Sequence, residues 1–438
     1  MAPAVLLRAL ALLSLASFTA FATPIRPLAQ EHVVVGESPD PQNTPLYNPS
    51  ILRLDTGRLV AAYTVSAKGG NTSSGTRVLV SDDRGTTWKA SSAMFRIGQA
   101  RLFPAGRSIY LIGSAKPLRI TRSDDGGTTW TEPAVIAEGS WHQTASNFLR
   151  AKGNIYFALE KRVGEEVQAW LVGDLAPVLM RARETDDLTR RESWTFASEL
   201  AFKDVLPGYR QNELGIDWFG VPFYPHNFPK SHILVRKPYN RNSAPLGWLE
   251  TNVARITDPD HYWFDPSGNT FHLLMRAHTG GTGYGALAKV VENADGTMTT
   301  SLEKVPSGKT QLFLPIPGGQ MRFHVLQDAR TGLYWLLGSQ STDSMTRAEA
   351  LPPDRYSLPN NERHRLVLHF SRNLVDWCFA GVVAIGHTPK EARHYAAMDF
   401  DGDDLVILSR SGDARAKSAH DGNLITFHRV KNFRDLVY

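Results

Sequence analysis

Two octets in the first third of the chain decide the fold: Ser81-Asp82-Asp83-Arg84-Gly85-Thr86-Thr87-Trp88 and, 42 residues further on, Ser123-Asp124-Asp125-Gly126-Gly127-Thr128-Thr129-Trp130. Both fit the pattern Ser-x-Asp-x-Gly-x-Thr-Trp. The pattern is typical of a tight turn, in which the carboxylate accepts backbone N–H groups, the glycine adopts a conformation closed to other residues, and the tryptophan packs between strands. A repeat of about 40 residues is the length of a four-stranded sheet, so the octets predict repeated sheets.

The rest of the chain has the pattern of an all-β protein. Short apolar segments, such as 77–80, 109–112 and 154–158, alternate with turns rich in Gly, Asp and Asn, and long helical periodicity is absent. Weaker versions of the octet lie at 185–194 and 371–377. No Pro-rich or Ser-rich linker divides the chain. We therefore predict one β-propeller domain over residues 23–438, with seven blades favoured and six as the alternative.

Each blade of the expected ring has an inner strand, and one strand pair closes the ring. Inner strands are predicted to begin near Tyr47, Gln99, Trp141, Asn212, Asp260, Met321 and Arg393. Closure is expected from pairing of 424–428 with 33–35, which would remove the open edge of the last sheet.

The N-terminus indicates export. Arg8 precedes an apolar run over 9–21, and Ala20-Phe21-Ala22 supplies a small-x-small cleavage pattern, so residues 1–22 are predicted to be a secretory signal peptide. The run is too short to span about 30 Å of hydrocarbon, so no membrane anchor is expected. The mature protein is predicted to be extracellular and monomeric.

The composition of the chain excludes several classes of protein and of functional site. With 42% hydrophobic and 21% charged residues the 438-residue chain is not disordered, and a net charge of +5 without a basic block argues against nucleic-acid binding. Its one cysteine excludes an internal disulfide and a thiolate metal site. No metal or cofactor motif occurs, and the aspartates around Gly402 are interpreted as a hairpin turn.

Candidate functional residues recur where the inner strands should meet at a central channel. The residues predicted to transfer protons are His142, His261, His394 and Tyr395. The residues predicted to bind substrate are Lys161, Arg276, His278, Arg322 and Arg410. A single histidine on a strand is usually structural, but this group would neutralise a carboxylate and exchange protons near neutral pH. An acidic oligosaccharide or polysaccharide is therefore the predicted ligand, and no carboxylate pair stands out.

The two octets are Asp boxes, and together with residues 48–59 they make the chain resemble the sialidase superfamily over nearly all of its predicted mature length. The resemblance implies that Asp83 and Asp125 support the fold and take no part in chemistry. Sialidases begin their first blade with Arg-Ile-Pro, whose arginine belongs to a carboxylate-binding triad, whereas this chain has Tyr47-Asn48-Pro49. The Tyr/Glu nucleophile pair of that family cannot be assigned from the sequence.

The C-terminal half, at 260–263, 393–395 and 418–421, is similar to secreted L-rhamnose-α-1,4-D-glucuronate lyases. This resemblance implies an exo-acting lyase that works by β-elimination with a catalytic histidine. From its position at the start of a predicted inner strand, His142 is predicted to transfer the proton. A sialidase-like glycoside hydrolase (sialidase or rhamnosidase) and a non-catalytic glycan-binding propeller are the alternatives. A His/Arg/Tyr cluster in the channel would favour elimination, an arginine triad with Tyr and Glu would favour a sialidase, and an apolar or blocked channel would favour binding alone.

Overall fold

The computed structural model describes residues 25–67, 74–91, 94–114, 116–142, 146–164, 168–169, 171–206, 208–211, 235–236, 245–279, 283–342, 362–388 and 390–438. The predicted signal peptide and the predicted inner strand near Asn212 lie outside the described residues.

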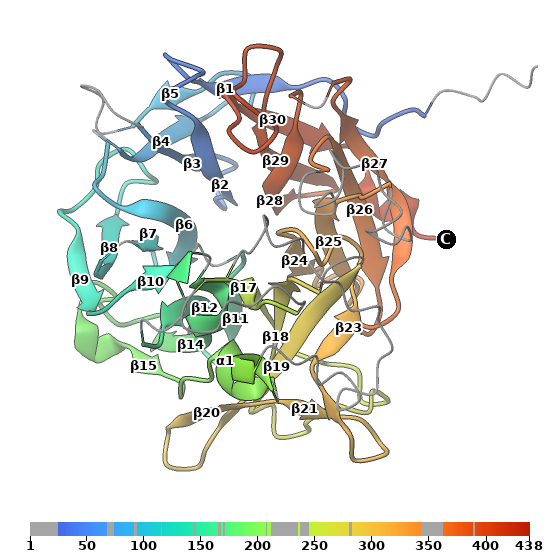
Figure 1. Cartoon of the computed structure of the whole chain (residues 1–438). Coiled ribbons are helices and arrows are strands. Elements are labelled where there is room, and N and C mark those ends of the chain that lie inside the picture. Colours follow the sequence, from blue (N-terminus) through green and yellow to red (C-terminus); the bar gives the residue numbers. More distant parts are fainter. Residues whose placement is uncertain are drawn as a thin grey trace, which may run out of the picture.

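The described strands form six sheets whose main path has four strands each, and Figure 1 shows these sheets arranged around a central axis. Blade 1 consists of β2 (Leu46–Arg53), β3 (Leu59–Val65), β4 (Gly75–Ser81) and β5 (Lys89–Ala90). Blade 2 consists of β6 (Gly98–Ala105), β7 (Ser108–Ser114), β8 (Leu118–Ser123) and β9 (Ala134–Ala137). Blade 3 consists of β10 (Trp141–His142), β12 (Asn154–Arg162), β14 (Leu175–Arg183) and β15 (Thr195–Phe196), with β11 (Leu149–Ala151) beside β12.

The second half of the chain completes the ring. Blade 4 consists of β17 (Trp248–Ala254), β18 (Thr270–Ala277), β19 (Tyr284–Glu292) and β20 (Met298–Ser301), with β23 (Phe313–Pro315) beside β19. Blade 5 consists of β24 (His324–Gln327), β25 (Tyr334–Ser339), β26 (Arg365–Ser371) and β27 (Cys378–Ile385). Blade 6 consists of β28 (Arg393–Asp401), β29 (Asp404–Ser411), β30 (Leu424–Val430) and β1 (Val33–Glu37). The innermost strands are β2, β6, β10, β17, β24 and β28 (Figure 1).

The structure has the six-bladed form of the predicted propeller rather than the favoured seven-bladed form. Between β15 and β17 the described residues add the one-turn helix α1 (Phe202–Val205) and short 3₁₀ and strand segments, but no further blade. The inner strand of blade 4 is β17, and Asp260 lies in a turn that follows it. Asp258, Pro259 and Asp260 favour turns, so the prediction placed that strand too late in the sequence.

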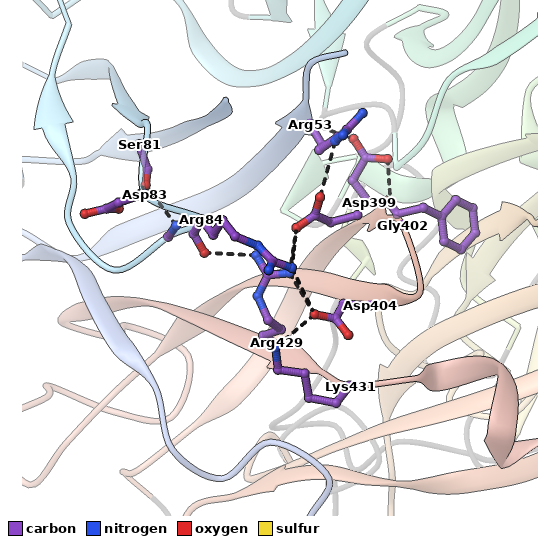
Figure 2. A network of polar contacts seen from close by, with 12 residues as sticks. Arg53, Ser81, Asp83, Arg84, Asp399, Gly402, Asp404, Arg429 and Lys431 are labelled. Carbon is purple, nitrogen blue, oxygen red and sulfur yellow. Dashed lines mark hydrogen bonds and ion pairs between the residues drawn. The ribbon is translucent and has the colours of Figure 1, made fainter. Parts of the chain in front are cut away.

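Closure of the ring is confirmed. β1 pairs with β30, with Val33 opposite Phe427. Beside this strand pair, Arg429 bonds to Asp401 and Asp404 and donates to the carbonyl of Arg84 at 2.9 Å, which links blade 6 to blade 1 (Figure 2). Figure 2 also shows Asp404 near the β28–β29 turn, where Asp401 pairs with Asp404 across Gly402, so the predicted hairpin turn is confirmed.

The Asp boxes are the turns between the third and fourth strands of their blades. In the first box, Asp83 accepts hydrogen bonds from the Ser81 hydroxyl at 2.8 Å and from the N–H of Thr87 at 2.9 Å, while the indole of Trp88 donates to the carbonyl of Gly85. Gly85 has φ of +94°, and a Cβ there would meet the ring of Phe427 at 2.4 Å. The second box repeats these bonds, and the two weaker octets occupy the equivalent turns of blades 3 and 5.

The core consists of apolar side chains packed between neighbouring blades. One cluster joins blades 2 and 3, and another joins blades 1 and 6. No helix among the described residues is long and apolar enough to cross a bilayer. Cys378 is a free, partly buried thiol, so packing and hydrogen bonds hold the ring.

Candidate active site

Four inner strands share one irregularity at the point where they begin. Asn48, Gln99, Glu250 and Tyr395 have φ values of 51°, 51°, 62° and 49°. Each lies within a shift of register between the inner strand and its neighbour, as in a β-bulge. A left-handed conformation costs a residue other than glycine about 1–2 kcal/mol, and such strain is concentrated at functional sites. The structure therefore singles out Glu250 and Tyr395 as residues whose positions are held against a local cost.

Arg276 joins these two residues. Its Nη1 donates a hydrogen bond to the Tyr395 hydroxyl and lies 3.4 Å from Oε2 of Glu250, while its Nε donates to the carbonyl of Gln320 at 2.9 Å. The side chains come from blades 4 and 6, and the exposed fractions of Glu250, Arg276 and Tyr395 are 1%, 5% and 6%. The other carboxylate oxygen of Glu250 has no hydrogen-bond partner among the described residues. A buried phenol and a buried carboxylate thus share one guanidinium group.

Two further arginines surround the same phenol. The Cζ atoms of Arg363 and Arg410 lie 5.1 Å and 5.2 Å from the centre of the Tyr395 ring, and Arg410 also lies 4.1 Å from the ring of Tyr47. Both arginines are buried. Burial lowers the pKa of Arg410 to about 9, and the charge of Arg363 adds to this effect. We call Glu250, Arg276, Arg363, Tyr395 and Arg410 the axial cluster. Three buried guanidinium groups with one carboxylate between them form a site for an anion.

Neutral histidines border the axial cluster. His394 contacts Nη1 of Arg363 at 3.1 Å through Nδ1, and its ring centre lies 5.0 Å from that of Tyr395. Burial lowers the pKa of His142 to about 4, with the charges of Arg162 and Arg276 adding to the effect and Glu250 opposing it. Burial also holds the pKa values of His278 and His394 well below the ordinary value. These imidazoles are therefore uncharged at neutral pH.

Tyr47, the residue that the sequence resemblance sets against the first arginine of the sialidase motif, lies beside Arg410. Its hydroxyl donates to Oδ1 of Asp421 at 2.5 Å, and the same oxygen lies 2.7 Å from Nδ1 of His420. Burial, together with this bond to Asp421, raises the pKa of Tyr47. The phenol therefore stays protonated, and Arg410 from blade 6 supplies the cation beside it.

The structure brings together seven of the nine predicted site residues: His142, His278, His394, Tyr395, Arg276, Arg322 and Arg410. The charges of Glu250 and Tyr395 act on Arg322, which is 2% exposed, and burial lowers its pKa.

Lys161 and His261 do not join them, which corrects the prediction. Lys161 bonds to Glu199 at 2.5 Å, because Glu160 faces blade 4, where it accepts two hydrogen bonds from Thr251, and strand alternation turns Lys161 to the other face of β12. His261 lies in the turn after β17 and contacts the carbonyl of Asn373, in the weak Asp box of blade 5, at 3.0 Å.

The sequence prediction missed Glu250 and Arg363. Glu250 is the one charged residue between Pro245 and Ala254, and a carboxylate inside such a buried strand was a usable signal. Arg363 stands in the run Glu362-Arg363-His364-Arg365, which has the composition of a solvated surface. Among the described residues, no group of three or more His, Cys, Asp and Glu side chains is placed to hold a metal ion.

Comparisons with known proteins bear on the fold. No protein-family model and no curated protein sequence matches the chain. Among solved structures, the Hadza microbial sialidase Hz136 is similar, with a TM-score of 0.51 and 15% identity over 91% of this chain and 68% of that chain. A mutant of Trypanosoma rangeli sialidase displaying trans-sialidase activity has a TM-score of 0.51 and 14% identity, and the match covers 95% of this chain and 61% of that chain.

A second structure of the Trypanosoma rangeli enzyme, in complex with sialic acid, gives the same TM-score of 0.51, with 14% identity over 95% of this chain and 61% of that chain. The protein thus spans less than two thirds of the length of these Trypanosoma sialidases. Likeness at this level of identity concerns the fold, and it confirms the predicted all-β, sialidase-like propeller.

Proposed function

We propose that the protein is a carbohydrate-active enzyme that hydrolyses a glycoside whose sugar carries a carboxylate, with Tyr395 as nucleophile. The observation that carries this proposal is the axial cluster, in which Arg276 joins Tyr395 to Glu250 and two more arginines lie on the phenol ring. An arginine triad with Tyr and Glu is the arrangement expected of the sialidase alternative. The structure therefore supports that alternative better than the lyase that the sequence favoured.

The chemistry follows from the charges. The substrate carboxylate binds between the guanidinium groups of Arg276, Arg363 and Arg410, which offer paired N–H donors. A carboxylate nucleophile would be repelled by that anion, whereas a neutral phenol approaches the neighbouring anomeric carbon without repulsion. Glu250, with one oxygen that has no partner among the described residues, accepts the phenol proton as the bond from the phenol oxygen to the anomeric carbon forms and the glycosidic C–O bond breaks. The aglycone leaves as an oxyanion and takes a proton from solvent. Water then hydrolyses the glycosyl-tyrosine bond.

A second candidate is β-elimination at a rhamnose–glucuronate linkage, and His142 is the observation that favours it. Its pKa of about 4 keeps the imidazole neutral beside Glu250 and Arg276, and its Nδ1 is buried with no hydrogen-bond partner among the described residues. Elimination needs a neutralised carboxylate, a base for the C5 proton and an acid for the leaving oxygen. Arginine, histidine and tyrosine supply these groups without a carboxylate pair.

Product analysis separates the candidates. We would incubate the protein with aryl α-sialosides, aryl glucuronides, aryl rhamnosides and gum arabic; aryl leaving groups need no acid catalyst, so they report on the nucleophile alone. A hydrolase releases the aryl group and a reducing sugar without an ultraviolet-absorbing product. A lyase releases rhamnose from gum arabic and leaves an unsaturated uronate that absorbs in the ultraviolet. Binding without turnover would support a glycan-binding propeller and contradict both enzymes.

We further propose that the protein is exported, is processed near Ala22, and acts as a monomer on an acidic glycan outside the cell. The N-terminal Arg8 and apolar run support export. The N-terminal sequence of the protein recovered from culture medium tests the cleavage, and its mass in solution tests the monomer. A retained N-terminus or a stable oligomer would contradict this proposal.

A further inference from the structure

A second group of buried cations lies further along the axis than the axial cluster. Arg101 on β6 contacts His324 on β24, with 3.3 Å between Nη2 and Nε2. Blades 2 and 5 lie opposite each other in the ring of six, so this contact spans the axis. The same His324 ring bonds to Met398, three residues beyond Tyr395 on β28, which places it roughly 10 Å further along that strand.

Arg322 lies between the two groups, because it interacts with the charges of Glu250 and Tyr395 as well as with that of Arg101. It precedes His324 by two residues, and Phe323 between them packs in the core, so alternation along the extended chain directs Arg322 and His324 to the same side. The exposed fractions of Arg101, Arg322 and His324 are 1%, 2% and 0%. All three side chains are therefore shielded from bulk water.

The two guanidinium groups are not satisfied by neighbouring side chains. Nε and Nη1 of Arg101, and Nε and Nη2 of Arg322, are buried and have no hydrogen-bond partner among the described residues. Arg101 also lies 6.0 Å from the ring of Phe148, a weak compensation. Arginine keeps its proton in proteins, and a buried charge without a partner is strongly unfavourable.

The tautomer of His324 adds another hydrogen-bond donor to this group. Nδ1 accepts the backbone N–H of Met398 at 2.9 Å, so Nδ1 carries no proton and the neutral ring carries its proton on Nε2. Nη2 of Arg101 is also a donor. Two donors 3.3 Å apart do not bond to each other, but both are able to donate to one acceptor beside them. The geometry is that of a site for an electron-rich atom.

The neighbouring carboxylates leave the group positive. Asp399 raises the pKa of Arg101 against the effect of burial, but its two oxygens already accept the N–H groups of Arg53 at 2.7 Å and Phe400 at 2.8 Å. Burial raises the pKa of Glu160 to about 8, so that carboxyl is protonated at neutral pH. Glu250 is bonded to Arg276.

We propose that Arg101, Arg322 and His324 bind a small monovalent anion of the size of chloride on the axis of the propeller. This site adjoins the one proposed for the glycan, with Arg322 next to both, and it binds its anion in the absence of any sugar. The anion accepts N–H bonds from both guanidinium groups and from Nε2 of His324. Its negative charge compensates the positive charges of Arg101 and Arg322, which come from opposite blades.

Bromide diffraction tests the site directly, because bromide replaces chloride and scatters anomalously. Crystals of the full chain grown or soaked in sodium bromide are expected to show an anomalous peak between Arg101, Arg322 and His324. Water alone at this position would overturn the proposal. An anomalous peak confined to Arg276, Arg363 and Arg410 would overturn it too, since the anion would then occupy only the glycan site.

Thermal unfolding gives the test in solution. The unfolding midpoint of the wild type is expected to rise by a few degrees, saturably, in sodium chloride compared with sodium gluconate at equal ionic strength. Arg101→Gln should lose this difference, and the exposed control Arg107→Gln should keep it. If Arg101→Gln does not fold, Arg322→Gln serves in its place. Equal midpoints of the wild type in the two salts would contradict the proposal.

Discussion

The Asp-box turns and the axial cluster differ in the burial and in the hydrogen bonding of their charged side chains. In the first Asp box the carboxylate is exposed and its hydrogen bonds are complete, and bonds from the hydroxyl and the N–H of Thr87 lower the pKa of Asp83 to about 2. In the axial cluster the charges are buried, one oxygen of Glu250 has no partner among the described residues, and two residues hold left-handed conformations. The repeated residues therefore build the ring, whereas the reacting groups of the proposed site lie where blades depart from the repeat.

The largest effect is expected from removing the reacting groups of the axial cluster. Tyr395→Phe and Glu250→Gln should each lower kcat/KM by about 10³-fold or more, because nucleophile and base act as one unit. Their unfolding midpoints should fall, because each change removes a partner of the buried Arg276, so activity is compared below the unfolding transition of each variant. The exposed Tyr262→Phe is the matched control and should retain activity. Full activity of Tyr395→Phe would show that the phenol of the axial cluster, like the Asp boxes, takes no part in the reaction.

A smaller effect is expected from changing the geometry of one cation. Arg363→Lys keeps the charge but loses the paired donors, so KM for a carboxylate substrate should rise about 10-fold to 100-fold. The same variant should hardly affect turnover of an analogue whose carboxylate is an amide. Arg415→Lys, on an exposed arginine paired with Asp413, is the control. An equal loss on the acid and the amide would show that Arg363 does not recognise the carboxylate.

The buried Glu160 predicts a change of stability with pH. Its folded pKa of about 8 lies above the value of 4.5 expected when it is unfolded. The stability that it contributes is therefore present at low pH and is lost as the pH rises through this window, by at most about 1.4 kcal/mol per pH unit.

Glu160→Gln stays neutral, so its unfolding midpoint should gain on the wild type between pH 5 and 8, as measured by calorimetry. The exposed Glu132→Gln should show no such trend. A constant difference between the unfolding midpoints of Glu160→Gln and the wild type across this pH range would mean that Glu160 is ionised in the folded protein.

The smallest effect is expected in the Asp boxes. Burial would raise the pKa of Asp125, but bonds from Thr129 and Ser123 outweigh it and hold the pKa at about 2. Asp125→Asn should lower the unfolding midpoint by a few degrees above pH 4, and the gap should close as the pH falls toward 2, where the wild-type carboxylate is protonated. Activity should stay within about twofold, and the exposed Asp82→Asn should match the wild type. A large loss of activity in Asp125→Asn would contradict the structural role.

The sequence predicted the ring far better than the site. The octets revealed the turns because their chemistry is local, and strand 33–35 was matched to its partner because an open edge must be closed. Tyr395, Arg276 and Arg410 were also predicted. Glu250 was missed because the bulge that holds it needs no glycine, and the one signal, a carboxylate inside a buried strand, was overlooked. Arg363 was missed because its charged run has the composition of a solvated surface. Lys161 was predicted on the wrong face of its strand, because successive residues face opposite sides and its neighbour Glu160 takes the buried side.

Trapping the reaction on Tyr395 tests the central claim most directly. The protein would be mixed with an active aryl glycoside whose sugar carries fluorine next to the anomeric carbon, a change that slows breakdown of a glycosyl-enzyme, and then quenched and digested. We predict that mass spectrometry finds the sugar covalently attached to the peptide at Tyr395, and that Glu250→Gln forms the adduct far more slowly. Release of the aryl group without any adduct on Tyr395, or an adduct on another residue, would contradict the account.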